Sequence, residues 1–228
     1  MGICENYSAI REDVDRAARA CGRDPESVTV IAVSKTFPAS DINEAIRGGI
    51  RIFGESKIQE SKEKIPLLEG DFSLHMIGHL QSNKAKDAVR IFDLIHSIDK
   101  ESTAEKVARE AAAIGKIQRV LLQVNTSGED SKSGCSPAEA IAICKKISQL
   151  QNIRIEGLMT IGPNDDTIDS AKQSFSLLRG LRDRMRESTG LELRELSMGM
   201  SGDYACAVEE GATLLRIGSA IFGNRTYA

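Results

Sequence analysis

The sequence predicts an α/β fold, a single (β/α)8 TIM barrel with an extra N-terminal helix. Strand-like and helix-like segments alternate with short connections at a spacing of roughly 25 residues, and the chain approaches the roughly 250 residues of a typical barrel. Several strand candidates are rich in Val, Ile and Leu without strict alternation, which is typical of parallel strands covered on both faces. A doubly wound open sheet is the alternative.

Eight strands are expected, at residues 28–34, 50–54, 72–78, 93–99, 119–125, 153–160, 193–199 and 213–218. Helical patterns occupy residues 41–49, 105–115, 138–152, 168–189 and 203–211, after a first helix within about the first 25 residues. Ser40 is the expected N-cap of the helix at 41–49, and Gly48-Gly49 ends it. No linker, low-complexity tract or internal repeat interrupts the pattern, so residues 1–228 are expected to form one domain.

The bulk composition argues against several classes of partner. The 228 residues include 41% hydrophobic and 28% charged side chains, with a net charge of -3. Nothing in this balance indicates binding to nucleic acid or to an anionic membrane. No apolar run approaches the ~20 residues of a membrane span, and the N-terminus lacks the pattern of a signal peptide. We therefore expect a cytoplasmic protein.

Neither the cysteines nor the histidines indicate a metal site. The five cysteines are scattered and have no CxxC spacing, so we expect buried or partly buried free thiols. His75 and His79 straddle a strand end and would not share one face reliably. His96 is expected in the core or at the rim of the barrel.

The segment VTVIAVSKTFP (28–38) places Lys35 at the carboxyl end of the first strand, where the active sites of such barrels lie. Lys35 shares its side-chain direction with Ile31 and Val33, so it is expected to point into the mouth of the barrel. A lysine partly desolvated there has a lowered pKa, and its neutral amine attacks an aldehyde to form a Schiff base. The alternative is an ordinary surface lysine just past the strand end.

The stretch LSMGMSGDYACAVEEGATLLRIGSAIFG (196–223) has features of a phosphate site. Glycine-rich turns follow the last two strands, where many barrels bind phosphate on helix N-termini, and Ser201 and Ser219 can add hydroxyl donors. The alternative is that these glycine and serine residues only form turns and bind no ligand. Arg216, inside the last strand, should have a specific partner, and an ion pair with a barrel carboxylate is the alternative to a ligand contact.

Seven stretches together resemble one family: AVSKTFP, FGES followed by Gln59-Glu60, HMIGHLQSNK, LLQVNTSGEDSKSG, GLMTIGP, LSMGMSGDY and RIGSAIFGNR. In this order, over about residues 28–225, they are similar to the pyridoxal 5′-phosphate (PLP) homeostasis proteins. The barrel of that family is similar to the N-terminal barrel of alanine racemase.

The resemblance implies a fold-type III barrel that binds PLP as its cofactor. Carried over position by position, Lys35 would form the Schiff base and Arg216 would face the pyridine nitrogen. The phosphate would be held by the following residues: Ser201, Gly218, Ser219 and the backbone of Met200. The family usually has FGEN where this chain has Ser56, so an asparagine contact to the cofactor would be replaced or lost.

Three functions follow from these features. The favoured one is a PLP homeostasis protein or carrier, a monomer that holds PLP without catalysed turnover and passes it to apo-enzymes. A PLP-dependent amino-acid racemase needs a base on each face of the substrate α-carbon. Lys35 supplies one, and the chain is expected to lack the second domain that supplies the other in alanine racemase, since it ends at Ala228. A Schiff-base aldolase acting on a phosphorylated sugar would need no PLP.

Overall fold

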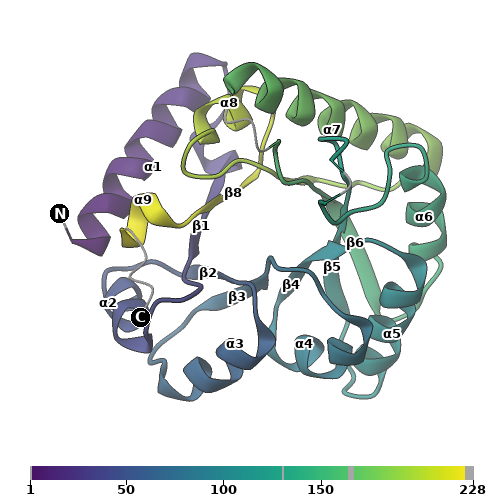
Figure 1. Cartoon of the computed structure of the whole chain (residues 1–228), viewed down its shortest axis with the longest axis horizontal. Coiled ribbons are helices and arrows are strands. Elements are labelled where there is room, and N and C mark those ends of the chain that lie inside the picture. Colours follow the sequence, from purple (N-terminus) through teal and green to yellow (C-terminus); the bar gives the residue numbers. More distant parts are fainter. Residues whose placement is uncertain (1, 130, 164–166, 224–228) are drawn as a thin grey trace.

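Eight parallel strands close into a barrel that helices surround (Figure 1). The computed structural model describes residues 2–129, 131–163 and 167–223. The strands are β1 (Thr29–Val33), β2 (Ile52–Glu55), β3 (Ser73–Met76), β4 (Leu94–Ile98), β5 (Gln118–Gln123), β6 (Ile153–Met159), β7 (Glu195–Ser197) and β8 (Leu214–Ile217). The helices are α1 (Ile3–Ala20), α2 (Ala39–Arg47), α3 (Ile58–Lys64), α4 (Ala85–Ile91), α5 (Glu101–Ala112), α6 (Ala140–Ile147), α7 (Ile168–Thr189), α8 (Tyr204–Glu209) and α9 (Ser219–Phe222). None of the helices in these ranges has the length and apolar character that a membrane crossing requires.

The barrel closes because its first and last strands pair. β1 and β8 run parallel, with Ile31 opposite Arg216 and Ala32 opposite Ile217. Every other strand pairs with its neighbours in chain order. The prediction of a (β/α)8 barrel is therefore confirmed. The alternative of an open sheet is wrong, since an open sheet leaves the edges of two strands unpaired.

Apolar side chains form two separate layers. A small cluster fills the barrel interior: Ile31, Leu94, Leu121, Met159 and Leu214. A much larger cluster lies between the outer faces of the strands and the helices, with Phe53, Phe92 and Phe175 among its fully buried members. Burial on both faces explains why the strands appear in the sequence as apolar runs instead of alternating patterns.

Short polar helices are where the structure departs from the sequence pattern. The pattern does not predict α3 or α4; in α3 only Ile58 and Ser61 are buried, too few positions to produce a helical period. Ser40 is not the N-cap of α2. That helix begins at Ala39, and Pro38 lies before it in an extended conformation, which suits a residue that cannot donate a backbone hydrogen bond.

The extra N-terminal helix α1 packs against α8 and α9, so the first helix of the chain lies beside the last two (Figure 1). Side chains of this segment hydrogen-bond to main-chain oxygens there. Asn6 Nδ2 donates to Ile221 O at 2.9 Å. The Arg23 guanidinium donates to Val208 O at 2.7 Å and to Ala212 O at 2.8 Å. These bonds fix α1 across the seam where the barrel closes.

All five cysteines are free thiols. Cys135, Cys144 and Cys206 are buried and Cys4 is half-buried. Cys21 is exposed, which differs from the expectation, because it follows the last turn of α1 at the protein surface.

Candidate functional site

A cavity of about 260 Å³ lies at the carboxyl ends of the strands, beside the seam between β8 and β1. Its lining residues are Val33, Lys35, Ser56, Ile77, Ile161, Met200, Ser201, Gly202, Arg216, Gly218 and Ser219. The structure thus brings all seven candidate residues of the sequence into one cavity, although they follow or end four different strands. This end of a barrel is where its loops can vary without disturbing the core, which is why functional sites lie there.

Lys35 lies two residues after the end of β1, in the turn that follows it, and is half-buried in the cavity wall. The strand ladder continues through its neighbour, since Ser34 N donates to Gly54 O at 3.1 Å. Val33, two residues earlier, lines the same cavity, as the alternation of side chains along a strand requires. Lys35 is thus less exposed than the ordinary surface lysine of the alternative.

Arg216 lies within β8 and is 5% exposed. Its Nη1 donates to Ser197 Oγ at 2.7 Å and its Nη2 donates to Thr160 O at 2.8 Å. Both acceptors are neutral oxygens. Burial lowers the pKa of Arg216 to about 10, and the negative charge of Asp203 opposes that shift. The guanidinium therefore stays a cation at neutral pH, with N–H donors beyond these two for the cavity.

A column of buried polar groups continues from Arg216 across the barrel interior. Ser197 Oγ lies 2.8 Å from His96 Nδ1, and His96 Nε2 lies 3.1 Å from His75 Nδ1. An arginine can only donate, so Ser197 Oγ accepts from it and can give its own proton to His96. This order assigns the proton of His96 to Nε2. Burial lowers the pKa of both histidines, for His75 to about 4, so both are neutral at pH 7.

Acidification from about pH 7 to about pH 4 is expected to cost about 3 kcal/mol of unfolding free energy through His75 alone. The folded-state pKa of His75 lies below the ordinary value of 6.5, so the unfolded chain binds a proton that the native site excludes. Stability therefore falls as the pH falls through this window. Urea unfolding of the wild type and His75→Asn across the window should give a smaller loss in the variant.

The exposed His79 supplies the matched control for that comparison, as His79→Asn. Burial raises the pKa of Glu55, so acidification increases the unfolding free energy through this carboxyl group. That contribution is common to all three proteins and cancels in the differences. Parallel stability curves for the wild type and His75→Asn would contradict the prediction.

His75 and His79 do not share a site. His75 points into the barrel interior, whereas His79 is exposed and its Nδ1 lies 3.6 Å from Asp99 Oδ2. His96 is fully buried inside the barrel, which agrees with its expected place in the core. Among the described residues, no group of three or more histidine, cysteine or acidic side chains could hold a metal ion.

The loops after β7 and β8 form the remaining wall of the cavity. Gly218 precedes α9, and Ala220 N donates to Ser201 Oγ at 3.4 Å, which joins the two loops. Met200 N already donates to Asp203 Oδ1 at 2.5 Å. In this conformation the N–H of Met200 is therefore bonded within its own loop.

Ser56 belongs to two neighbouring cavities. Besides the first, it borders a cavity of about 560 Å³ between the loops that follow β2 and β3. The two loops touch closely, because a Cβ on Gly78 would lie 2.2 Å from Ser56 O. Only glycine fits at that position without a shift of the main chain.

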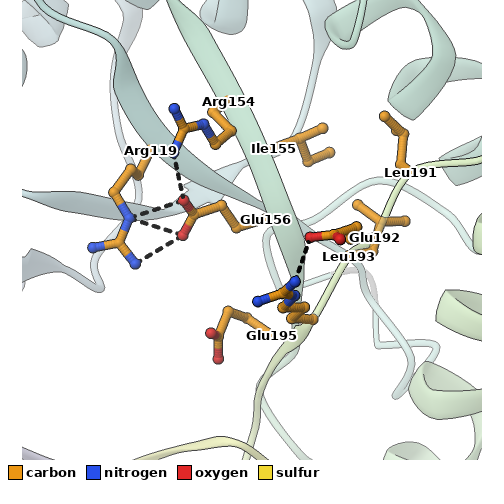
Figure 2. A pocket seen from close by; sticks show the side chains of 9 residues that line it. Arg119, Arg154, Ile155, Glu156, Leu191, Glu192, Leu193 and Glu195 are labelled. Atoms are coloured by element: carbon orange, nitrogen blue, oxygen red, sulfur yellow. Dashed lines mark hydrogen bonds and ion pairs between the residues drawn. The ribbon is translucent and has the colours of Figure 1, made fainter.

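A further pocket, of about 440 Å³, lies at the opposite, amino-terminal end of the strands (Figure 2). Most of its charged side chains pair with one another, and Glu195 Oε2 accepts a hydrogen bond from Thr213 Oγ1 at 2.6 Å. Arg119 Nε donates to both carboxylate oxygens of Glu156, at 2.9 and 2.8 Å, and Arg194 lies 2.9 Å from Glu192. Figure 2 shows the Arg119–Glu156 pair beside Arg154. Self-compensated charges at this end of a barrel are typical of structural contacts.

The chain matches the family described as alanine racemase, N-terminal domain, over residues 6–226. The chain is therefore a barrel of the alanine racemase N-terminal domain class. An alanine racemase of Clostridium difficile 630 has the same fold, with a TM-score of 0.76 and 15% identity, over 96% of this chain and 57% of the other. At that identity the likeness concerns the fold alone.

Within that class, the chain belongs to the pyridoxal phosphate homeostasis proteins. The Pseudomonas aeruginosa protein of that name is 41% identical over 226 residues, which cover 99% of this chain and 96% of the relative. A structure of PipY from Synechococcus elongatus PCC7942 with PLP bound has a TM-score of 0.86 and 38% identity, over 97% of this chain and 100% of the other. The family predicted from the motifs is confirmed.

Proposed function

We propose that this chain binds PLP as a Schiff base on Lys35 and serves in PLP homeostasis without strong catalytic turnover. The observation that carries the proposal is the single cavity in which an amine, a buried cation and a set of hydroxyl and glycine residues meet. The relationship to PipY, solved with PLP bound, supports it.

The cavity residues fit the chemical groups of PLP. Lys35 offers the amine for the aldehyde. Ser201, Ser219 and the main chain at Gly218 offer donors for the phosphate, since the first N–H groups of a helix have no partner within it. Arg216 offers a cation for the pyridine nitrogen. Ser56 lies where the family usually has asparagine and would contribute a hydroxyl there, while Met200 would form part of the wall.

PLP supplies an aldehyde that condenses with amines. Lys35 would bond to its aldehyde carbon through the neutral amine nitrogen, and the two amine protons would leave with the aldehyde oxygen as water. Arg216 would hold the ring nitrogen unprotonated, because two adjacent cations repel. An unprotonated ring withdraws carbanion electrons poorly, which acts against turnover.

The makeup of the cavity favours a carrier over a racemase. Among the described lining residues, the only ionisable side chains are Lys35 and Arg216, and the arginine is a cation at neutral pH. Racemisation needs a base on each face of the substrate α-carbon, and this set offers one. Relatives at 35–41% identity carry the name homeostasis protein. The alternative of a Schiff-base aldolase has less support, because it leaves the family relationship unexplained.

The proposal extends to how the protein acts in the cell. We propose a monomer of one domain over residues 1–228 as the acting unit, because the residues proposed to contact PLP all come from one copy of the chain. A Schiff base can be exchanged to another amine, so apo-enzymes with an active-site lysine are the proposed recipients of PLP in the cytoplasm.

Titration of the purified protein with PLP tests the proposal. We expect a visible Schiff-base absorption band that borohydride removes, and peptide mapping should then place the pyridoxyl group on Lys35. An aldolase would show no protein-bound band once unbound PLP is removed by gel filtration. Label found mainly on Lys84 or Lys132 would contradict the assignment.

Deuterium exchange at the α-carbon of L-alanine in D₂O separates the carrier from the enzyme. Added amino acid should change the spectrum or release PLP without appreciable exchange. Rapid exchange that disappears in Lys35→Ala would show catalysis and overturn the carrier proposal.

A further inference from the structure

Three charged side chains lie next to the segment that carries Lys35 without lining its cavity: Glu55 at the end of β2, and Glu60 and Lys64 of α3. Lys64 Nζ lies 3.0 Å from Glu55 Oε1 and 2.5 Å from Glu60 Oε1. Their side chains are 2% (Glu55), 12% (Lys64) and 21% (Glu60) exposed. We call these three residues the clamp.

The clamp holds the residue before Lys35 by its main chain and its side chain. Lys64 Nζ donates to Ser34 O at 2.9 Å, and Ser34 Oγ donates to Glu55 Oε1 at 2.7 Å. Ser34 is fully buried. The carbonyl group that links Ser34 to Lys35 is therefore fixed by a charged donor inside the protein, where such bonds are strong.

The clamp also holds the residue after Lys35. Thr36 has a φ of 72°, in the left-handed region that a β-branched residue rarely adopts. Its N–H donates to Glu60 Oε1 at 2.5 Å, and a turn closes around it, since Phe37 N donates to Ser34 O at 3.1 Å. A strained conformation persists only where its surroundings enforce it, and the hydrogen bond to Glu60 is one of the contacts that hold Thr36.

Stability alone does not account for the clamp. Glu55 Oε2 is buried with no hydrogen-bond partner among the described residues. A buried ion pair often stabilises a fold no more than apolar side chains of similar size would. The bonds of the clamp converge on the main chain at Ser34 and Thr36, so their effect is local to Lys35.

We propose that the clamp is a positioning device for Lys35, which fixes the main chain on both sides of the lysine so that its amine meets the PLP aldehyde in one orientation. This inference rests on the proposed function, because it presupposes that Lys35 is the attachment residue. Glu60 and Lys64 act through the main chain and touch no part of the cavity, so they are positioning residues.

Helix α3 supplies matched controls for the test. Glu60→Gln and Lys64→Met remove charges of the clamp. Glu63→Gln and Lys62→Met are the same replacements on the same helix, at side chains that bond to Gln59 and Asp87 outside the clamp. Thermal unfolding monitored by circular dichroism establishes that each variant is folded.

Two ligands distinguish a misplaced Lys35 from a cavity that is disturbed as a whole. PLP forms the Schiff base, whereas 4′-deoxypyridoxine 5′-phosphate carries the ring and the phosphate but no aldehyde. In stopped-flow experiments Glu60→Gln and Lys64→Met should form the visible band about tenfold to hundredfold more slowly than the wild type, as misorientation of a reacting group predicts. Their affinity for the deoxy analogue should stay within about twofold of the wild type, since the phosphate contacts remain.

Wild-type rates in both clamp variants would overturn the inference. Equal losses of affinity for PLP and the analogue would also overturn it, because they would show a loosened cavity instead of a misplaced lysine. If Lys64→Met does not fold, the comparison of Glu60→Gln with Glu63→Gln decides alone. A wild type that forms no Schiff base on Lys35 would refute the proposed function itself, whereas a labelled Lys35 with normal rates in Glu60→Gln would refute only the clamp.

Discussion

Replacing Lys35 with alanine is expected to abolish the covalent retention of PLP completely. Once unbound PLP is removed by gel filtration, the protein should show no visible Schiff-base band, because Lys35 is the only amine among the described residues that line the cavity. Non-covalent binding should remain, since the phosphate and ring contacts come from other loops. The measurement is spectrophotometric titration, followed by borohydride reduction and mass spectrometry of the intact protein.

Lys84→Ala is the matched control for this loss. Lys84 is exposed and borders the neighbouring cavity of the β2 and β3 loops, so its removal should leave the band of the wild type. A Lys35→Ala protein that keeps a band of wild-type intensity, with the label moved to another lysine, would show that a different amine carries PLP.

The phosphate is expected to make PLP bind at least about a hundredfold tighter than pyridoxal. Charge-assisted hydrogen bonds to a phosphate are each worth about 1.5 kcal/mol or more, so two of them give a factor of about a hundred. Ser201 and Ser219 are on the two loops that would supply them. Ser201→Ala should remove about one such bond and narrow the difference in affinity about tenfold.

The change in the ratio of PLP affinity to pyridoxal affinity on Ser201→Ala is a sharper test than the ratio in the wild type alone. Free pyridoxal closes to an internal hemiacetal, which weakens its apparent binding for reasons unrelated to the protein, but this effect is the same in both proteins and cancels. Ser40→Ala, at an exposed serine of α2, should leave the ratio unchanged. Equal affinities for PLP and pyridoxal, or a ratio that Ser201→Ala does not change, would contradict a phosphate site on these loops.

The candidate residues on strands could be predicted because side chains alternate strictly along a strand. That period fixes the direction of Lys35 relative to Val33, and of Arg216 relative to Leu214, without knowledge of the rest of the fold. The barrel itself could be predicted from the alternation of segments. Its closure could not be derived from any local signal, since it depends on the pairing of β1 with β8.

The supporting residues could not be predicted from local patterns. Ser197, His96 and His75 meet only because the register of the barrel brings three strands to one level, and no spacing in the sequence records that register. Glu60 and Lys64 are four residues apart on α3, a helix with too few apolar positions to be recognised. A glutamate and a lysine with this spacing would ordinarily be taken for a solvent-exposed pair.

The pairing of the first strand with the last has a consequence for synthesis of the protein on the ribosome. Lys35 is made early, but Arg216 and the loop at Gly218 that complete its cavity are made near the end. Under the proposed function, a growing chain therefore carries the reactive lysine long before it can retain PLP. Contacts between such distant segments also form late in folding. PLP would bind only to finished barrels and, by mass action, would lower the fraction that is unfolded, so occupancy by PLP would mark the molecules that have completed folding.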